Sequence, residues 1–145
     1  MLCLSSGYPY AMEIYSERKN ESSRMPLGED VVTHTLPKIA DKSRHEIYFD
    51  KFYTSCNLLK KLEDSRIRVT GTVRNNGIRQ CPLINNITLA KETRGVMDYR
   101  SDGTVIICRW KDNVVVTVAS NHQKHEPISN TKRYFKWTKK KMDVT

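Results

Sequence analysis

The sequence contains no long run of apolar residues, and none approaches the roughly 18 that a membrane-spanning helix needs. Its N-terminus also lacks the basic stretch and apolar core that together form a signal peptide. Both absences argue against secretion and against a membrane partner. We therefore expect an intracellular protein.

Cysteine is scarce and scattered along the chain. None of the four cysteines has a second one at the short spacing that a zinc site requires, so we expect them to be reduced and structural. They are Cys3, Cys56, Cys81 and Cys108. His122 and His125 lie close together on a polar stretch and are interpreted as surface residues rather than metal ligands.

Motifs for nucleotide binding and for nucleophilic catalysis are absent. The sequence has no glycine-rich phosphate loop, no dinucleotide fingerprint, no recognisable serine or cysteine nucleophile with its histidine, and no internal repeat. We therefore expect no small-molecule substrate.

Acidic residues are outnumbered by basic ones. The chain has 16 Asp and Glu against 25 Lys and Arg, which gives a formal net charge of +9. This excess favours an anionic partner such as nucleic acid, although a solvated basic surface is an equally simple interpretation. The 145 residues are enough for one globular domain with a sizeable core.

The clearest structural signal lies in residues 45–62. An apolar run at residues 47–49 predicts a buried strand, and Asp50 follows it directly. Thr54 or Ser55 can then cap a helix whose leucines recur at helical spacing. These leucines are Leu58, Leu59 and Leu62. We expect the strand that ends at Asp50 to be the central strand of a mixed sheet covered on both faces.

Asp50 has two interpretations. Aspartate most often initiates a turn, which requires no function. In an open α/β sheet, however, chemistry takes place just beyond the carboxyl ends of strands, where the pattern places Asp50. On the residues alone, both interpretations stay open.

The segments on either side of this stretch predict further elements. A hairpin is expected from residues 1–6 and 11–15, a loop at 17–24, and a helix at 27–40 that Pro37 ends or kinks. Residues 66–73 predict a strand followed by a turn at 75–77, and residues 81–93 are ambiguous between a loop and a short helix. An antiparallel meander is expected at 95–100, 104–110 and 114–119.

Residues 122–145 form a basic segment in which Tyr134, Phe135 and Trp137 are interleaved with positive charge. Its basic residues are Lys132, Arg133, Lys136, Lys139, Lys140 and Lys141. This mixture suits a nucleic-acid strand, because phosphates pair with cationic groups and bases stack on aromatic rings. A flexible tail and the edge of an incomplete core are the alternatives.

Several of these segments resemble, in order, the motifs of one protein family. The stretch YFDKFYTSCNLLKKL at residues 48–62 resembles the piggyBac transposase signature, which usually reads DN, Phe or Trp, and FTS before a leucine-rich helix. PLGEDVV at 26–32 lies upstream of it and GTVRNN at 71–76 downstream. The resemblance continues through CRWKDNVVVTVAS at 108–120 and covers most of the chain.

The resemblance implies an α/β fold with a partial RNase H-like mixed sheet, flanking helices and the antiparallel β meander. It also implies DNA cut-and-paste transposition, in which three aspartates hold two divalent ions, Mg²⁺ or Mn²⁺. Only the second of those aspartates has a match in this chain, and it is Asp50, the candidate catalytic and metal-binding residue. Lys51 replaces the usual Asn, and its ammonium group would repel metal ions.

The segments that carry the family's first and third aspartates have no match in the sequence. We therefore interpret the chain as an internal fragment, or a decayed copy, that binds no metal ion alone. Residues 1–121 are expected to form the partial transposase domain, with a core at about 1–77 and the meander at about 94–120. Residues 122–145 are expected to form a basic tail.

Two functional hypotheses follow. The first is a metal-dependent transposase domain that is inactive alone and belongs in the nucleus, with DNA as its partner and a homodimer as the intact form. The second is a non-catalytic basic module that binds nucleic acid or serves as a domesticated interaction module. In both, Arg74 and the basic residues from Lys132 to Lys141 are the candidate DNA contacts.

Overall fold

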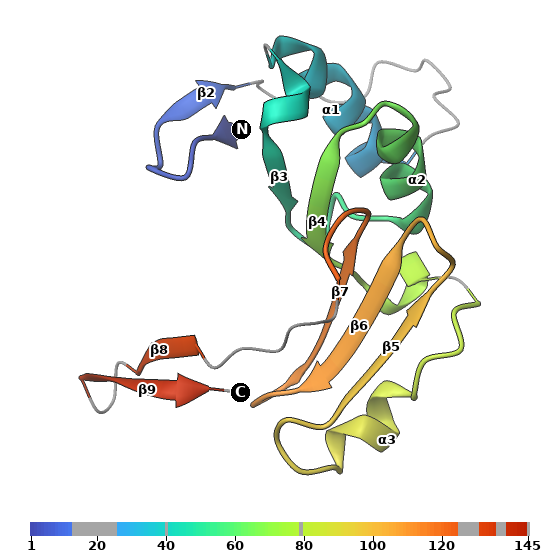
Figure 1. Cartoon of the computed structure of the whole chain (residues 1–145), viewed down its shortest axis with the longest axis vertical. Helices are drawn as coiled ribbons and strands as arrows, with labels where there is room; N and C mark the ends of the chain where they lie inside the picture. The colour runs from blue at the N-terminus through green and yellow to red at the C-terminus, as the bar shows by residue number, and fades with distance from the viewer. Residues whose placement is uncertain (13–25, 40, 79, 125–130, 136–138, 145) are drawn as a thin grey trace.

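The computed structural model describes residues 1–12, 26–39, 41–78, 80–124, 131–135 and 139–144 (Figure 1). Its strands are β1 (Leu2–Cys3), β2 (Pro9–Ala11), β3 (Glu46–Phe49), β4 (Arg68–Thr72), β5 (Met97–Ser101), β6 (Ile106–Lys111), β7 (Val115–Ser120), β8 (Thr131–Phe135) and β9 (Lys140–Val144). Its α-helices are α1 (Leu27–Thr35), α2 (Cys56–Asp64) and α3 (Asn86–Ala90). Short 3₁₀ helices cover Leu36–Lys38, Lys42–Arg44 and Asn75–Ile78.

A five-stranded mixed sheet in the order β3-β4-β7-β6-β5 forms the body of the chain. Strands β3 and β4 run parallel, with α2 connecting them, and every other neighbouring pair in this sheet is antiparallel. The expected meander is therefore present as β5, β6 and β7, and it continues the same sheet through the pairing of β4 with β7. The predicted mixed α/β class is confirmed.

The prediction that the strand ending at Asp50 is central was wrong. Within the described residues, β3 is an edge strand, and β4 takes the inner position between β3 and β7. Val69 of β4 is completely buried, whereas Tyr48 of β3 is 68% exposed. The apolar run at residues 47–49 contains an outward-facing tyrosine, and the sequence alone gave no sign that this residue faces solvent.

Helices cover one face of the sheet rather than both, as far as the described residues show. Ile47 and Val69 form one core cluster with Val32 and Leu36 from the α1 region and with Leu58 of α2. A second cluster joins Leu59 of α2 to Ile107 and Ala119. Residues that alternate with these, such as Val118, Cys108 and Trp110, share the opposite face, because their strands pair in register.

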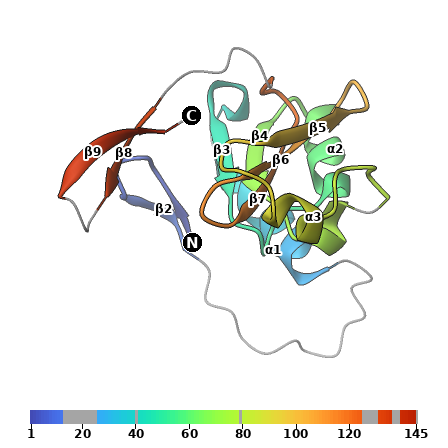
Figure 2. The same cartoon turned by 90° about the horizontal axis from the view of Figure 1, so that it is seen from below.

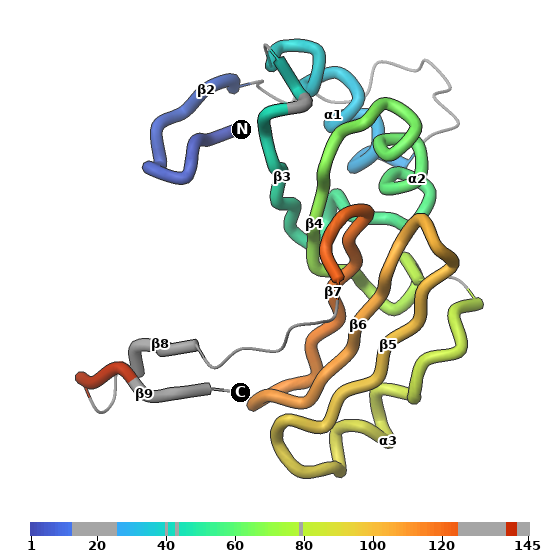
Figure 3. Tube along the Cα trace, in the orientation of Figure 1, coloured from blue at the N-terminus to red at the C-terminus, as the bar shows by residue number. Residues whose placement is uncertain are grey.

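The helix α2 forms as its leucine spacing predicts. Leu58, Leu59 and Leu62 are all buried, and Ser55, rather than Thr54, is the N-cap residue, with its Oγ accepting a hydrogen bond from Leu58 N at 3.2 Å. Figure 3 shows the chain passing from β3 through α2 to β4. The predicted helix at 27–40 ends at Thr35, and Pro37 lies in the 3₁₀ helix that follows.

Two small sheets accompany the main one. Strands β1 and β2 form an N-terminal hairpin, and both views place it on the side of β3 away from α2 (Figures 1 and 2). Its second strand lies at Pro9–Ala11, earlier than the expected 11–15, and residues 13–15 lie outside the described residues. The segment expected to be a tail contains a second antiparallel pair, β8 and β9. The ambiguous segment at 81–93 contains α3, whereas the loop expected at 17–24 lies outside the described residues. No helix in the described part of the chain is apolar and long enough to cross a membrane.

Candidate functional site

Asp50 lies directly beyond the carboxyl end of β3, as predicted, and its side chain is exposed. Its Oδ1 accepts a hydrogen bond from Lys51 N at 2.7 Å. Its backbone carbonyl oxygen accepts two more, from Tyr53 N at 2.9 Å and from Thr54 Oγ1 at 3.0 Å. Asp50 therefore initiates a tight turn, and the same turn fixes its carboxylate at the strand end.

The helix α1 packs closely against this turn. A Cβ atom at Gly28 would lie 2.5 Å from Phe52 O and 3.1 Å from Tyr53 Cα, so only glycine permits this approach. The next residue, Glu29, is 6% exposed, and its Oε1 accepts a hydrogen bond from Ser55 Oγ at 2.5 Å. Through these contacts the PLGEDVV motif holds the turn after Asp50 and the start of α2 in place.

Strand β4 brings a third motif, GTVRNN at residues 71–76, to the turn after Asp50. A Cβ atom at Gly71 would collide with Thr54 Oγ1 and would lie 3.0 Å from Phe49 O. Arg74, just beyond the end of β4, has its Cζ 5.4 Å from the centroid of the Phe52 ring, within the range of a cation–π contact. Parallel strands end at the same side of a sheet, so Asp50 and Arg74 lie near each other.

The fourth motif, CRWKDNVVVTVAS at residues 108–120, contacts the site through Arg109 of β6, which is 3% exposed. Its guanidinium donates hydrogen bonds to Asn75 Oδ1 at 3.1 Å, to Ile84 O at 2.7 Å and to Thr117 Oγ1 at 2.9 Å. Burial lowers the pKa of this guanidinium below its ordinary value. Asn75 directly follows Arg74, so Arg109 anchors the connection that leaves the candidate site.

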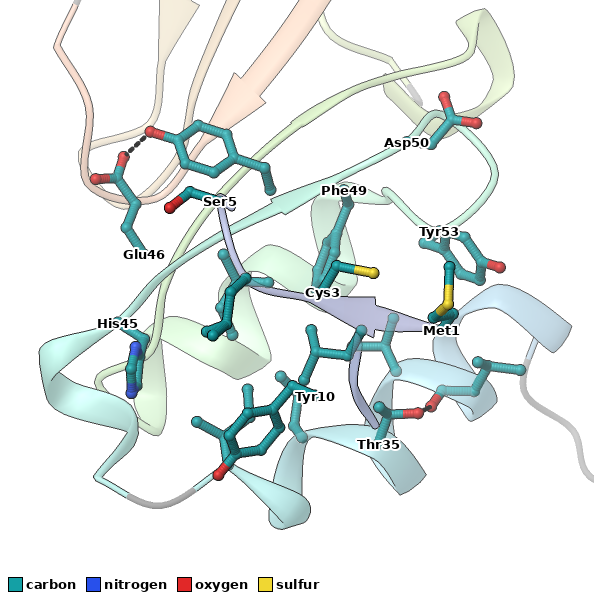
Figure 4. Close-up of a pocket in the computed structure, with 18 residues that line it drawn as sticks. Met1, Cys3, Ser5, Tyr10, Thr35, His45, Glu46, Phe49, Asp50 and Tyr53 are labelled. Atoms are coloured by element: carbon teal, nitrogen blue, oxygen red, sulfur yellow. Dashed lines mark hydrogen bonds between the residues drawn. The ribbon is translucent and has the colours of Figure 1, made fainter. Parts of the chain in front are cut away.

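An apolar hollow of about 610 Å³ lies between the β1–β2 hairpin, α1 and β3. Asp50 is at its rim, and Figure 4 shows the carboxylate directed away from lining residues such as Cys3 and Phe49. The hollow therefore does not enclose the candidate catalytic group.

The residues at the site do not form a divalent-metal site by themselves. A pair of catalytic ions needs several carboxylates, and Asp50 supplies one, with Oδ1 already engaged by the Lys51 backbone. Across the described ranges, no three His, Cys, Asp or Glu side chains come together in a way that could hold a metal ion.

The other predicted DNA contacts lie away from the main sheet's strands. Lys132 and Arg133 are in β8, Lys140 and Lys141 are in β9, and Lys139 precedes β9 with a left-handed backbone. Strands β8 and β9 pair only with each other among the described residues. The basic segment is therefore a hairpin in which Tyr134 lies opposite Lys141 and Phe135 opposite Lys140, and Lys136 lies outside the described residues.

Sequence reasoning did not assign a role to Glu29, Phe52 or Arg109. The hydrogen bond of Glu29 with Ser55 joins segments 26 residues apart, and no local pattern indicates such a contact. Arg109 lies in a strand pattern, where a charged residue suggests exposure. The signal that could have found these residues is their membership in the motifs that carry the family resemblance.

Comparisons with known proteins point to one family. A profile of the family described as Transposase IS4 matches residues 1–143. The human piggyBac transposable element-derived protein 3 is 42% identical over 106 residues, which are 72% of this chain and 18% of that protein. The human piggyBac transposable element-derived protein 2 is 37% identical over 114 residues, which are 76% of this chain and 19% of that protein.

The fold also matches that of a solved transposase. The cryo-EM structure of a piggyBac transposase synaptic complex with hairpin DNA superimposes with a TM-score of 0.61 at 24% identity, covering 88% of this chain and 26% of the other. The chain spans less than a fifth of the length of the two curated relatives. Since a profile covers nearly the whole chain and the two relatives are 42% and 37% identical over more than two thirds of it, the chain belongs to the Transposase IS4 family and, within it, to the piggyBac type.

Proposed function

We propose that this chain is a DNA-binding unit of a piggyBac-type transposase, in which Asp50 is a catalytic carboxylate that cannot act without further carboxylates. The observation that supports the proposal is the convergence of motifs on the turn after β3, where Gly28, Gly71 and Arg74 all contact residues 49–54. A turn that served only to connect β3 with α2 would not require contacts from so many separate segments.

DNA enters the proposal through charge and position. Arg74 lies at the strand ends beside Asp50, and the β8–β9 hairpin presents Lys139, Lys140 and Lys141 as exposed residues. Cationic side chains that neutralise phosphates release condensed counterions, which makes binding independent of sequence and sensitive to salt. A nuclear location and a homodimer belong to the same proposal for the intact protein.

Binding is tested by fluorescence anisotropy with labelled duplex DNA at several salt concentrations. We expect a dissociation constant of roughly 10⁻⁴ to 10⁻⁶ M at physiological salt. The plot of log affinity against log salt has a negative slope. Arg74→Ala should reduce the magnitude of this slope by about 1, and neutralising Lys139, Lys140 and Lys141 should reduce it further. Slopes equal to that of the parent chain would show that these residues do not contact DNA.

Catalysis is tested by a nicking assay with Mg²⁺ or Mn²⁺. The chain alone should not cleave DNA, because one carboxylate cannot hold the two ions that phosphoryl transfer requires. Metal-dependent nicking that Asp50→Asn abolishes would contradict the expected inactivity. In a chain extended with the family's other two aspartate segments, cleavage should depend on Asp50 and should improve with Lys51→Asn.

A non-catalytic DNA-binding module is the second candidate. It is favoured by the basic hairpin and by the lack, among the described residues, of a carboxylate cluster that could hold a metal ion with Asp50. An extended chain that binds DNA but shows no cleavage dependent on Asp50 would favour this candidate over the first.

A further inference from the structure

Phe52 is an exposed aromatic ring in the same turn as Asp50. The residue is 45% exposed, whereas its neighbour Tyr53 packs against the core cluster of α1, α2 and β3. Arg74 lies over the ring at 5.4 Å from its centroid, and Tyr53 contacts it edge-on at 5.1 Å with an interplanar angle of 83°. Two neighbours therefore hold the ring while nearly half of the residue stays accessible to solvent.

The backbone that carries Phe52 is fixed as well. The carbonyl oxygen of Phe52 contacts α1 so closely that Gly28 has no room for a Cβ atom. Hydrogen bonds from Tyr53 N and Thr54 Oγ1 to the Asp50 carbonyl close the turn around it. A ligand that stacks on this ring would therefore meet a surface that is already ordered, and little conformational entropy would be lost on binding.

We propose that Phe52 is a stacking platform for an unpaired DNA base, and that Arg74 meets the phosphate next to that base. The inference rests on the proposed function and specifies which form of DNA the strand ends hold. An aromatic ring stacks on any base, because every base has a π face, whereas the bases of an intact duplex expose their edges and not their faces. The guanidinium above the ring adds the positive charge that a phosphate needs.

Tyr48 is another exposed aromatic residue near the site, but its surroundings differ from those of Phe52. Tyr48 is more exposed than Phe52, but its hydroxyl donates a hydrogen bond to Glu46 Oε1 at 2.7 Å. The edge of the Tyr48 ring is therefore paired with an acidic group, whereas the face of the Phe52 ring has the guanidinium of Arg74 over it. Phe52 combines exposure with a neighbouring cation and with proximity to Asp50, and this combination supports the proposal.

The test measures binding of the full chain to an oligothymidylate of about 12 nucleotides and to a duplex of the same length, a size typical of a single binding surface. Phe52→Leu keeps an apolar side chain but removes the ring, and it should weaken binding to the single strand roughly 5- to 100-fold. Binding to the duplex should change by less than about twofold, because electrostatic contacts dominate it. Tyr99→Leu is the matched control, since Tyr99 is an aromatic residue of similar exposure, 40%, on the far edge strand β5.

A second variant reports on stacking directly. Phe52→Trp introduces a fluorophore at the proposed platform, and its emission should be quenched by oligothymidylate but not by an abasic strand with the same number of phosphates. The parent chain, which already contains two tryptophans, provides the baseline.

These measurements distinguish a failure of the stacking role of Phe52 from a failure of the proposed DNA-binding function. If the parent chain binds both forms of DNA and Phe52→Leu binds the single strand equally well, the stacking role is wrong and the DNA-binding function stands. The stacking role would also be wrong if the abasic strand quenched the emission of the Phe52→Trp variant as much as oligothymidylate does. If the parent chain binds neither form, the proposed function itself fails.

Discussion

At the scale of single residues, close packing at the strand ends explains most of the motif positions. Gly28 and Gly71 both lie where a side chain would overlap the turn after β3, and neither needs glycine for a left-handed backbone. Their role is to let α1 and β4 approach residues 49–54. Substitutions there should act through packing rather than through backbone strain.

Gly71→Ala should destabilise the chain by about 1–3 kcal/mol, because the added methyl group collides with Thr54 Oγ1 and crowds Phe49 O. Urea denaturation would measure the change in the free energy of unfolding. Gly103→Ala is a useful contrast, since nothing lies within 4 Å of its Cβ position and only the positive φ of 90° is unfavourable. A smaller loss for Gly71→Ala than for Gly103→Ala would contradict the packing argument.

Glu46 should make stability depend on acid pH. Hydrogen bonds from Tyr48, Gln123 and His122 lower the pKa of this carboxyl from 4.5 to about 2. Because the folded-state pKa is the lower one, the stabilisation is present above about pH 4.5 and is lost as the pH falls towards 2. Glu46→Gln should therefore reduce the loss of stability across this pH window.

The measurement for Glu46 is the free energy of unfolding at a series of pH values between these limits. Glu92→Gln serves as the control, because Glu92 is an exposed carboxylate outside this cluster. If both variants change the pH profile equally, the contribution does not come from the Glu46 cluster.

At the scale of elements, the sequence predicted the unit β3–α2 well and the position of β3 poorly. The leucine spacing of α2, its capping serine and the strand before Asp50 are local patterns, and the structure confirms them. The order of strands depends on pairings between distant segments, such as β4 with β7, and no local pattern encodes them. The same reason explains why the link between Arg109 and Asn75 could not be predicted.

Arg109→Met should destabilise the chain by about 2–4 kcal/mol, because it leaves Ile84 O and Asn75 Oδ1 without the guanidinium that satisfies them. Thermal or urea unfolding would report the loss. Arg44→Met is the control, since Arg44 forms an exposed ion pair with Asp41 at 2.8 Å and should contribute less than about 1 kcal/mol. Equal effects of the two substitutions would mean that Arg109 does not anchor the connection.

At the scale of the whole molecule, the main sheet presents two edges, β3 and β5. The β5 sequence places Asp98 and Arg100 on its edge, and charged residues discourage pairing with a second chain. Strand β3 presents Tyr48, and no strand in the described ranges pairs with its outer side. We therefore expect self-association to take place through β3.

Tyr48→Lys should lower concentration-dependent association, because a lysine on an edge strand opposes pairing between copies. Sedimentation velocity at increasing protein concentration would measure the shift towards monomer. Tyr99→Lys on β5 is the matched control and should leave association unchanged. Association that responds to the control and not to Tyr48→Lys would place the contact at the other edge.

The pairing of β4 with β7 also has a consequence during synthesis. Thr72 of β4 meets Val118 of β7, so the inner strand of the sheet stays unpaired on one side while the segment between them is translated. At roughly 5–20 residues per second, this interval lasts on the order of 2–10 s. Because β7 leaves the ribosome later than β4 by this same interval, β3, α2 and β4 are outside for that time with one side of β4, the strand that carries Val69, unpaired. A chaperone that recognises extended apolar segments would find its binding site there before β7 arrives.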